Sequence, residues 1–232
     1  MTPLAVIVGV GTGLSAALAR LLAREGHALV LAARDSDKLA ALAAETGARR
    51  VALDATDAEA TARLFDGLER PPRVVVYNPS ARLRGPVAEL DPEAVRRVLE
   101  VTALGAFFTA RAAVRRMLAA EPDADGTRGT ILFTGASAGV KGFARSAPFA
   151  MGKFAQRGLA QSMARELHPQ GIHVAWINID GAIRNPGRSE PADAPDSMLD
   201  PEAIAQAYLG LIRQHRSAWS NELTLRPWVE PF

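Results

Sequence analysis

Short runs of aliphatic and β-branched residues recur along the chain, and most are followed by a longer segment with apolar residues at helical spacing. The short runs predict strands at residues 4–8, 28–32, 50–53, 73–77, 130–134, 173–178 and 222–225. The longer segments predict helices at residues 13–25, 36–46, 58–68, 92–119, 146–167 and 201–215. Two of these helices begin with Asp-Pro-Glu, at Asp91 and Asp200, where aspartate is an N-cap acceptor and proline suits the first helical position.

Most of the predicted strands consist of a continuous apolar run, which indicates a sheet that is buried on both faces. Strands of this kind, separated by helices, are typical of a parallel sheet with helices on both sides. A length of 232 residues suits one large α/β domain or two small ones. We expect a single α/β domain over residues 1–232, with a doubly wound parallel sheet of about seven strands.

One stretch, RNPGRSEPADAPDSMLD at residues 184–200, has no apolar period and is rich in proline and acidic residues. It lies between the end of a predicted strand and a capped helix. Long connections without secondary structure are uncommon in compact domains, and many of them are lids or binding loops. We expect a lid on the substrate side, with a plain surface connection as the alternative.

Composition excludes several classes of function. The chain has no cysteine, so disulfides and a thiolate nucleophile are ruled out, and no two of its four histidines have metal-ligand spacing. Its 27 lysines and arginines are interspersed with 25 acidic residues, unlike the basic stripe of a nucleic-acid-binding protein. The N-terminus lacks the basic region of a signal peptide, and no apolar stretch reaches the ~20 residues of a membrane span. We expect a cytoplasmic protein without a metal, nucleic-acid or membrane partner.

Glycines follow the first predicted strand, in VIVGVGTGLSAALA. Gly9, Gly11 and Gly13 would let the backbone turn tightly and approach a pyrophosphate, which the free N–H groups of the next helix bind. The usual G-x-G-x-x-G spacing is not met, because Leu14 occupies the last glycine position, and a purely structural turn is the alternative. We predict a dinucleotide site at Gly9, Gly11, Thr12, Gly13 and Leu14.

The end of the second strand, LVLAARDSDKL, indicates which dinucleotide binds. An acid at this point binds the ribose 2′-hydroxyl of NAD(H), whereas an arginine accommodates the 2′-phosphate of NADP(H). Ala33 stands where the acid is expected, and Arg34 follows it with a guanidinium that can bind phosphate through two parallel hydrogen bonds. Asp35 is a complication, but Asp35 or Ser36 fits the N-cap of the next helix. We therefore expect NADP(H) rather than NAD(H).

In this order, the features resemble the short-chain dehydrogenase/reductase family over essentially the whole chain. Gly9 to Ser15 resembles the family's G-x-x-x-G-[IL]-G loop, with Ser15 in place of the last glycine. YNPSA resembles the family's N-N-A-G stretch, and NIDGAI resembles the turn after the sixth strand, with Asp180 in place of a proline. The resemblance implies a Rossmann fold and further cofactor-binding residues: Asp54 at the adenine ring, Asn78, Pro79 and Ser80 beside the groove, and Gly181 and Ile183 near the nicotinamide.

The family's catalytic Tyr-x-x-x-Lys would fall on the helix at 146–167, where this chain has Phe149 and Lys153. A separation of four places both side chains on one helical face, but Phe149 has no proton to give. The family's serine would fall at Ala136, with Ser137 one residue later, and its asparagine at Thr102. The chain has only two tyrosines and neither precedes a lysine by four residues, so the motif is absent rather than displaced.

Lys153 lies in an apolar helix, where a charge without partners is costly. The resemblance implies that its ammonium binds the ribose hydroxyls of the coenzyme, and a solvated surface lysine is the alternative. Hydride transfer also requires a source or sink for one proton. The candidates are Lys153 itself, Ser137, a water and Asp180, although Asp180 could instead cap the backbone N–H groups of its turn.

The residues and the resemblance together indicate two functions. The first is an NADP(H)-dependent oxidoreductase that acts on a small-molecule carbonyl or alcohol with non-standard proton transfer. The second is an NADP(H)-binding sensor or scaffold that has lost catalysis. The family's usual assembly implies a homodimer or homotetramer through the fourth and fifth helices and the last strand. We also expect the tail, with Trp228 and Phe232, to pack against a neighbour or its own core.

Overall fold

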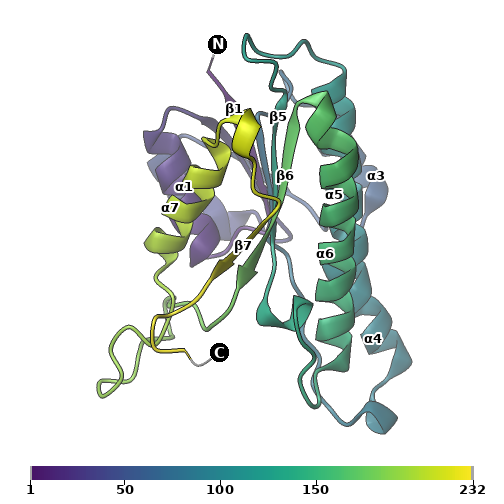
Figure 1. Ribbon diagram of the computed structural model, residues 1–232, viewed down its shortest axis with the longest axis vertical. Coiled ribbons are helices and arrows are strands. Elements are labelled where there is room, and N and C mark those ends of the chain that lie inside the picture. The colour runs from purple at the N-terminus through teal and green to yellow at the C-terminus, as the bar shows by residue number, and fades with distance from the viewer. Residues whose placement is uncertain (1, 231–232) are drawn as a thin grey trace.

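A computed structural model describes residues 2–230, and it has three layers, with a central sheet between two layers of helices (Figure 1). Every neighbouring pair of strands is parallel, in the order β3-β2-β1-β4-β5-β6-β7. The strands are β1 Leu4–Val8, β2 Ala28–Ala33, β3 Arg49–Ala52, β4 Val74–Tyr77, β5 Gly129–Thr134, β6 Ile172–Ile179 and β7 Glu222–Leu225. The chain reverses its direction of travel across the sheet between β1 and β4, the point at which doubly wound sheets bind ligands. The predicted fold class is confirmed.

The two faces of the sheet are covered by different helices (Figure 1). One face carries α1 Leu14–Arg24, α2 Ala40–Thr46 and α7 Pro201–Ile212. The other carries α3 Ala58–Asp66, α4 Pro92–Leu99, α5 Gly105–Leu118 and α6 Ala147–Leu167. Among residues 2–230, none of these helices is long and apolar enough to cross a membrane.

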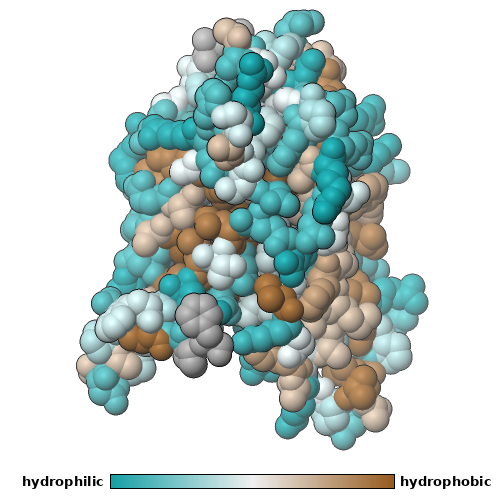
Figure 2. Space-filling model, viewed as in Figure 1, coloured by the Kyte–Doolittle hydropathy of each residue, from teal (hydrophilic) through white to brown (hydrophobic). Residues whose placement is uncertain are grey.

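Large apolar side chains remain exposed on α5 and α6. Phe107 on α5 is 45% exposed, and Met151 and Phe154 on α6 are 50% and 45% exposed. Figure 2 shows apolar surface over the lower end of α6. Near the C-terminus, Trp228 is 82% exposed, so packing of the tail against the protein's own core is wrong for Trp228, and packing against a neighbour stays a prediction. Phe232 lies outside the described residues.

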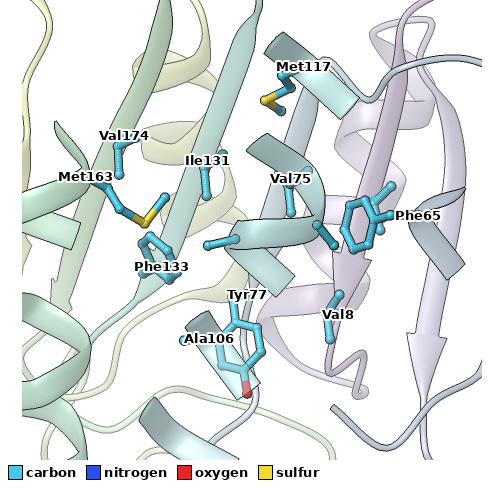
Figure 3. Packing of buried hydrophobic residues seen from close by; sticks show 14 of the residues in the cluster. Val8, Phe65, Val75, Tyr77, Ala106, Met117, Ile131, Phe133, Met163 and Val174 are labelled. Atoms are coloured by element: carbon cyan, nitrogen blue, oxygen red, sulfur yellow. The ribbon is translucent and has the colours of Figure 1, made fainter. Parts of the chain in front are cut away.

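The core divides into two clusters because successive strand side chains point to opposite faces of the sheet. Val6 and Val8 of β1 pack with α3, α5 and α6, whereas Ala5 and Ile7 pack with α1 and α7. In the first cluster, Val8 and Tyr77 point from the sheet toward the helical layer (Figure 3). Both faces of β1, β4 and β5 are fully covered, which holds their carboxyl ends in fixed positions at the sheet edge.

The predicted helix at 92–119 is interrupted by a π-helical turn at Glu100–Leu104, between α4 and α5. Two carbonyls in this turn accept hydrogen bonds from side chains of other elements: that of Val101 from the Tyr77 hydroxyl, and that of Thr102 from Gln156 Nε2 at 3.3 Å. Apolar spacing cannot predict the turn, because these partners come from distant parts of the chain.

The other predicted helices are confirmed with small changes at their ends. The segment at 36–46 begins with a 3-10 turn, Asp37–Leu39, and the last helix ends at Ile212 rather than at residue 215. Both predicted N-caps form. Asp91 accepts hydrogen bonds from the N–H groups of Glu93 and Ala94, and Asp200 accepts them from the N–H groups of Glu202 and Ala203. These caps satisfy N–H groups that the helix itself leaves free.

Candidate active site

Two adjoining cavities lie along the carboxyl edge of the sheet. The first, of about 880 Å³, is lined by the glycine loop after β1, the ends of β2 and β3, and the loop after β4. The second, of about 980 Å³, is lined by the loops after β4, β5 and β6 and by α6. Asn78 and Ser80 line both cavities, so the two meet beside the end of β4. No cluster of residues within 2–230 has the composition of a metal site.

The glycine loop is shaped by contacts of its backbone. Gly9 has a φ of +79°, and a Cβ there would lie 2.6 Å from the ring of Pro79, so only glycine fits. A Cβ at Gly11 would contact nothing within 4 Å, which leaves this part of the loop open toward the first cavity. Within the described residues, the N–H groups of Gly11, Thr12 and Gly13 have no hydrogen-bond partner. Free N–H groups at the start of a helix bind phosphate, so the loop fits a dinucleotide.

The two ends of the glycine motif have different surroundings. Gly13 is the N-cap of α1, and a Cβ at this position would lie 3.4 Å from Asn185. Leu14 contributes only its backbone to the loop, because its side chain is buried in the core. Ser15 accepts a hydrogen bond from Asn78 Nδ2 at 2.6 Å and donates one to the Gly9 carbonyl at 3.3 Å. The serine that replaces the family's last glycine therefore ties the loop after β4 to the glycine loop.

Arg34 lines the first cavity, and it forms no salt bridge or hydrogen bond with any residue in the described part of the chain. Its neighbour Asp35 is occupied, because it accepts from the Asp37 N–H at 3.1 Å and lies 3.3 Å from the Lys38 ammonium. The arrangement leaves a guanidinium free to bind an anion at the end of β2. The carboxylate of Asp35, which could have competed for Arg34, is bound to Asp37 and Lys38 instead.

Asp54 lines the same cavity and accepts hydrogen bonds from the N–H and the hydroxyl of Thr56, at 3.0 and 2.8 Å. These bonds lower the pKa of Asp54, so it is a carboxylate at neutral pH. Both bonds fall on Oδ1, and Oδ2 accepts no hydrogen bond from the residues between 2 and 230.

Lys153 lies in the second cavity and is only 2% exposed. Its Nζ donates to the Thr134 carbonyl at 2.6 Å and to Gln156 Oε1 at 3.4 Å. Burial, and then the positive charge of Arg82, lower the pKa of Lys153 to about 7. A solvated surface lysine, the alternative interpretation of the sequence, is therefore excluded.

Gln156 holds Lys153 in place, and the sequence pattern did not predict it. Its Oε1 also accepts from Trp176 Nε1 at 3.3 Å, and its Nε2 donates to the Thr102 carbonyl at the same distance. The Thr102 hydroxyl accepts from the Ala81 N–H, again at 3.3 Å. A glutamine one turn after the lysine carries no signal by itself, because its partners come from β6 and the π-helical turn.

Phe149 is 6% exposed and packs against Ala136 and Ala138 at the wall of the second cavity. The guanidinium of Arg82 lies over its ring, with Cζ 4.5 Å from the centroid. Such a cation–π contact contributes roughly 0.5–2 kcal/mol, depending on solvation. Four residues before Lys153, α6 therefore presents to the cavity a phenyl ring that is covered by a guanidinium. The sequence analysis missed Arg82, although ARLRG at residues 81–85 places two arginines five and seven residues after the last residue of β4.

Neither tyrosine of the chain lies in the second cavity. Tyr77 and Tyr208 are fully buried, and their hydroxyls bond the Val101 carbonyl and Thr134 Oγ1. Burial raises the pKa of each phenol. No phenol is therefore placed to exchange a proton with a substrate in this cavity.

Asp180 and Ser137 lie together in the second cavity. Burial alone would raise the pKa of Asp180, but hydrogen bonds from Ser137 and Arg226 outweigh it and the pKa is lowered. Arg226 Nε donates to the carboxylate at 2.9 Å. Asp180 is thus an ionised acceptor that fixes its neighbours, rather than a cap on the N–H groups of its own turn. Gly181 and Ile183 follow it along the same wall.

Residues 184–200 extend over both cavities, because Pro186 lines the first and Asn185 and Arg188 line the second. The base of this segment is closed by a bridge between Ile183 and Leu199 and by an ion pair between Arg184 and Asp200. Three residues of the segment thus reach the cavities, and the lid over the site stays a prediction.

The sequence and the fold identify the class of protein. The family model of the short-chain dehydrogenases matches residues 3–187, and the chain belongs to this family. It is similar to a short-chain dehydrogenase from Rhodopseudomonas palustris of known structure, with 34% identity, 98% of this chain and 100% of that chain covered, and a TM-score of 0.82.

Two further similarities extend this comparison. A metagenomic short-chain oxidoreductase crystallised in complex with NADP is 26% identical, with 99% and 98% of the two chains covered and a TM-score of 0.84. An uncharacterized oxidoreductase from Staphylococcus aureus (strain N315) is 28% identical, with 97% of this chain and 96% of the relative covered. The predicted family is confirmed.

Proposed function

We propose that this protein is an NADP(H)-dependent oxidoreductase that acts on a carbonyl or alcohol without the family's tyrosine. The observation that carries the proposal is the first cavity, where the free N–H groups of residues 11–13 and the unpaired Arg34 suit the phosphates of NADP(H). Ala33 offers no carboxylate to the 2′-hydroxyl of NAD(H). The similar metagenomic oxidoreductase was crystallised with NADP, which supports the same coenzyme here.

The residues of the second cavity would supply the proton that carbonyl reduction needs. The coenzyme, when bound, supplies the hydride, and reduction of a carbonyl also needs one proton on the oxygen. Lys153 is the proton donor that we assign, because its lowered pKa of about 7 lets it gain and lose a proton near neutrality. Its ammonium would also hold the ribose hydroxyls. Ser137, whose hydroxyl donates to the Asp180 carboxylate, keeps its oxygen free to accept a hydrogen bond from the hydroxyl of an alcohol substrate or product.

The alternative function is an NADP(H)-binding sensor or scaffold without turnover. It is favoured by the side chains at three positions where the family resemblance implies catalytic groups: Ala136 and Phe149 have no hydroxyl, and Thr102 has no amide. The first cavity would be unchanged in such a protein, so coenzyme binding alone does not separate the two functions.

Steady-state NADPH oxidation, followed by absorbance over a panel of ketones and aldehydes, separates them. Turnover that depends on the substrate supports the oxidoreductase. Tight NADPH binding without turnover, in the native chain and in Phe149→Tyr, supports the sensor or scaffold. A chain that binds no NADPH overturns both proposals.

We also propose that the protein is a homodimer or homotetramer assembled through α5 and α6. The exposed side chains of Leu104, Phe107, Met151 and Phe154 lie on this side of the molecule. Exposed apolar patches of this kind mark interaction sites in proteins that are otherwise well packed.

A further inference from the structure

The second cavity has an unbalanced charge. Six basic residues line it, five of them cationic at neutral pH, and Lys153 with its lowered pKa is the sixth: Arg82, Arg84, Lys141, Arg145, Lys153 and Arg188. Among the described residues, only two acidic ones do so, Asp180 and Glu230. Because Asp180 is held by Arg226 from outside this lining, its charge is already compensated. The cavity therefore carries a positive potential that its own acids do not neutralise.

Three of the four arginines that line this cavity, Arg82, Arg84 and Arg188, influence one another's charge through Arg82. Arg82 and Arg84 come from the loop after β4, and Arg188 comes from the segment at 184–200. Partial withdrawal from water, and then the charges of Arg84 and Arg188, lower the pKa of Arg82, which places Arg84 and Arg188 each within range to repel the Arg82 guanidinium. None of the three forms a salt bridge with a residue between 2 and 230.

The coenzyme does not account for these arginines. The residues that suit its phosphates, the glycine loop and Arg34, line the first cavity, whereas Arg82, Arg84 and Arg188 line only the second. Arg82 lies over the ring of Phe149, and Phe149 is one helical turn before Lys153 on α6. Arg82 therefore lies beside the lysine that we assign as proton donor, where the substrate would bind. A flat ring supports the flat guanidinium and leaves its edge free to donate hydrogen bonds.

We propose that the substrate carries an acid group, a carboxylate or a phosphate, which binds Arg82, Arg84 and Arg188. Guanidinium groups bind both kinds of oxyanion through paired hydrogen bonds. An acid group at this point would relieve the repulsion among the arginines and would connect the loop after β4 to the segment at 184–200. The inference rests on the proposed function in taking the second cavity as the substrate side.

Isothermal titration of the full-length protein, saturated with NADPH, tests this inference with paired probes. The first pair is 4-oxopentanoate and its methyl ester, and the second is dihydroxyacetone phosphate and dihydroxyacetone. We expect the acid of at least one pair to bind about tenfold or more tighter than its neutral partner, as charge-assisted hydrogen bonds imply. The pair that shows the difference tells whether the group is a carboxylate or a phosphate.

Variants complete the test. Arg82→Gln shortens the side chain slightly, keeps an amide donor and removes the charge, and we expect it to abolish the preference for the acid while NADPH affinity is kept. Arg63→Gln, an exposed arginine on α3, is the matched control and should leave the preference unchanged. Equal affinity for acid and neutral partner in both pairs, or a preference that survives Arg82→Gln, overturns the inference. If NADPH itself fails to bind, the proposed function fails, and the same titration without coenzyme still decides the anion site.

Discussion

Phe149 and Lys153 lie one helical turn apart on α6, and the structure gives them different partners from those that the family's motif implies. Lys153 is held by a backbone carbonyl and Gln156, and Phe149 supports Arg82. The phenyl ring of Phe149 and the lowered pKa of Lys153 thus belong to one arrangement, in which burial first and then the nearby Arg82 guanidinium favour the neutral amine.

The first prediction concerns the stability of the buried amine. Below pH 7, Lys153 is protonated in the folded and the unfolded chain, so the cost of burying the charge is present in full. As the pH rises from about 7 toward the unfolded value of about 10.4, the folded chain loses this proton first and the cost disappears. We expect the free energy of unfolding of the native chain, relative to Lys153→Met, to rise by roughly 2 kcal/mol between pH 7 and 9. Urea unfolding at several pH values measures this difference, and a difference independent of pH contradicts it.

The second prediction concerns the missing phenol. Phe149→Tyr adds a proton donor at the wall of the second cavity, next to Lys153. General acids contribute about 10²–10⁴-fold to rate, and we expect a gain near the lower end in NADPH oxidation with simple ketones, because Ala136 supplies no serine hydroxyl. Phe154→Tyr, on the exposed face of the same helix, is the matched control and should show no gain. A Phe149→Tyr variant no faster than this control would show that the phenol is not what limits turnover.

At the scale of elements, two glycines of the glycine loop have different roles: Gly9 is needed for the fold, and Gly11 leaves space for the coenzyme. Gly9→Ala combines a positive φ with a contact of 2.6 Å to Pro79, so we expect a marked fall in the melting temperature. Gly11→Ala meets nothing within 4 Å, and we expect it to keep the native melting temperature but to weaken NADPH binding. Calorimetry and NADPH fluorescence measure the two effects. Equal loss of stability in both variants would contradict this division of roles.

The elements also show where sequence patterns succeed. The strands, the N-caps at Asp91 and Asp200 and the glycine loop depend on residues close together in the chain, and they were predicted within a few residues. The π-helical turn was not predicted, because it depends on Tyr77 and Gln156 from other elements. The Arg82–Phe149 and Asp180–Arg226 contacts were missed for the same reason, since they join segments that the sequence separates by at least 46 residues.

At the scale of the whole molecule, α5 and α6 present apolar side chains that the fold leaves uncovered. We expect Met151→Asp to place a charge in the proposed subunit interface and to shift the protein toward smaller species in sedimentation velocity. Val87→Asp is the control, because Val87 is exposed in a 3-10 turn before α4. An unchanged sedimentation profile for Met151→Asp, or an equal shift in both variants, would contradict assembly through this surface.

The function of the whole molecule depends on the coenzyme that the first cavity binds, and the guanidinium of Arg34 is the group that decides it. The most direct measurement is a fluorescence titration of the native chain and of Arg34→Gln with NADPH and with NADH. We expect the native chain to bind NADPH at least about tenfold more tightly than NADH, because only NADPH has a 2′-phosphate for charge-assisted hydrogen bonds with Arg34. We expect Arg34→Gln to lose this preference. Equal or tighter binding of NADH by the native chain, or a preference that persists without the guanidinium, would contradict NADP(H) as the coenzyme and Arg34 as its recognition group.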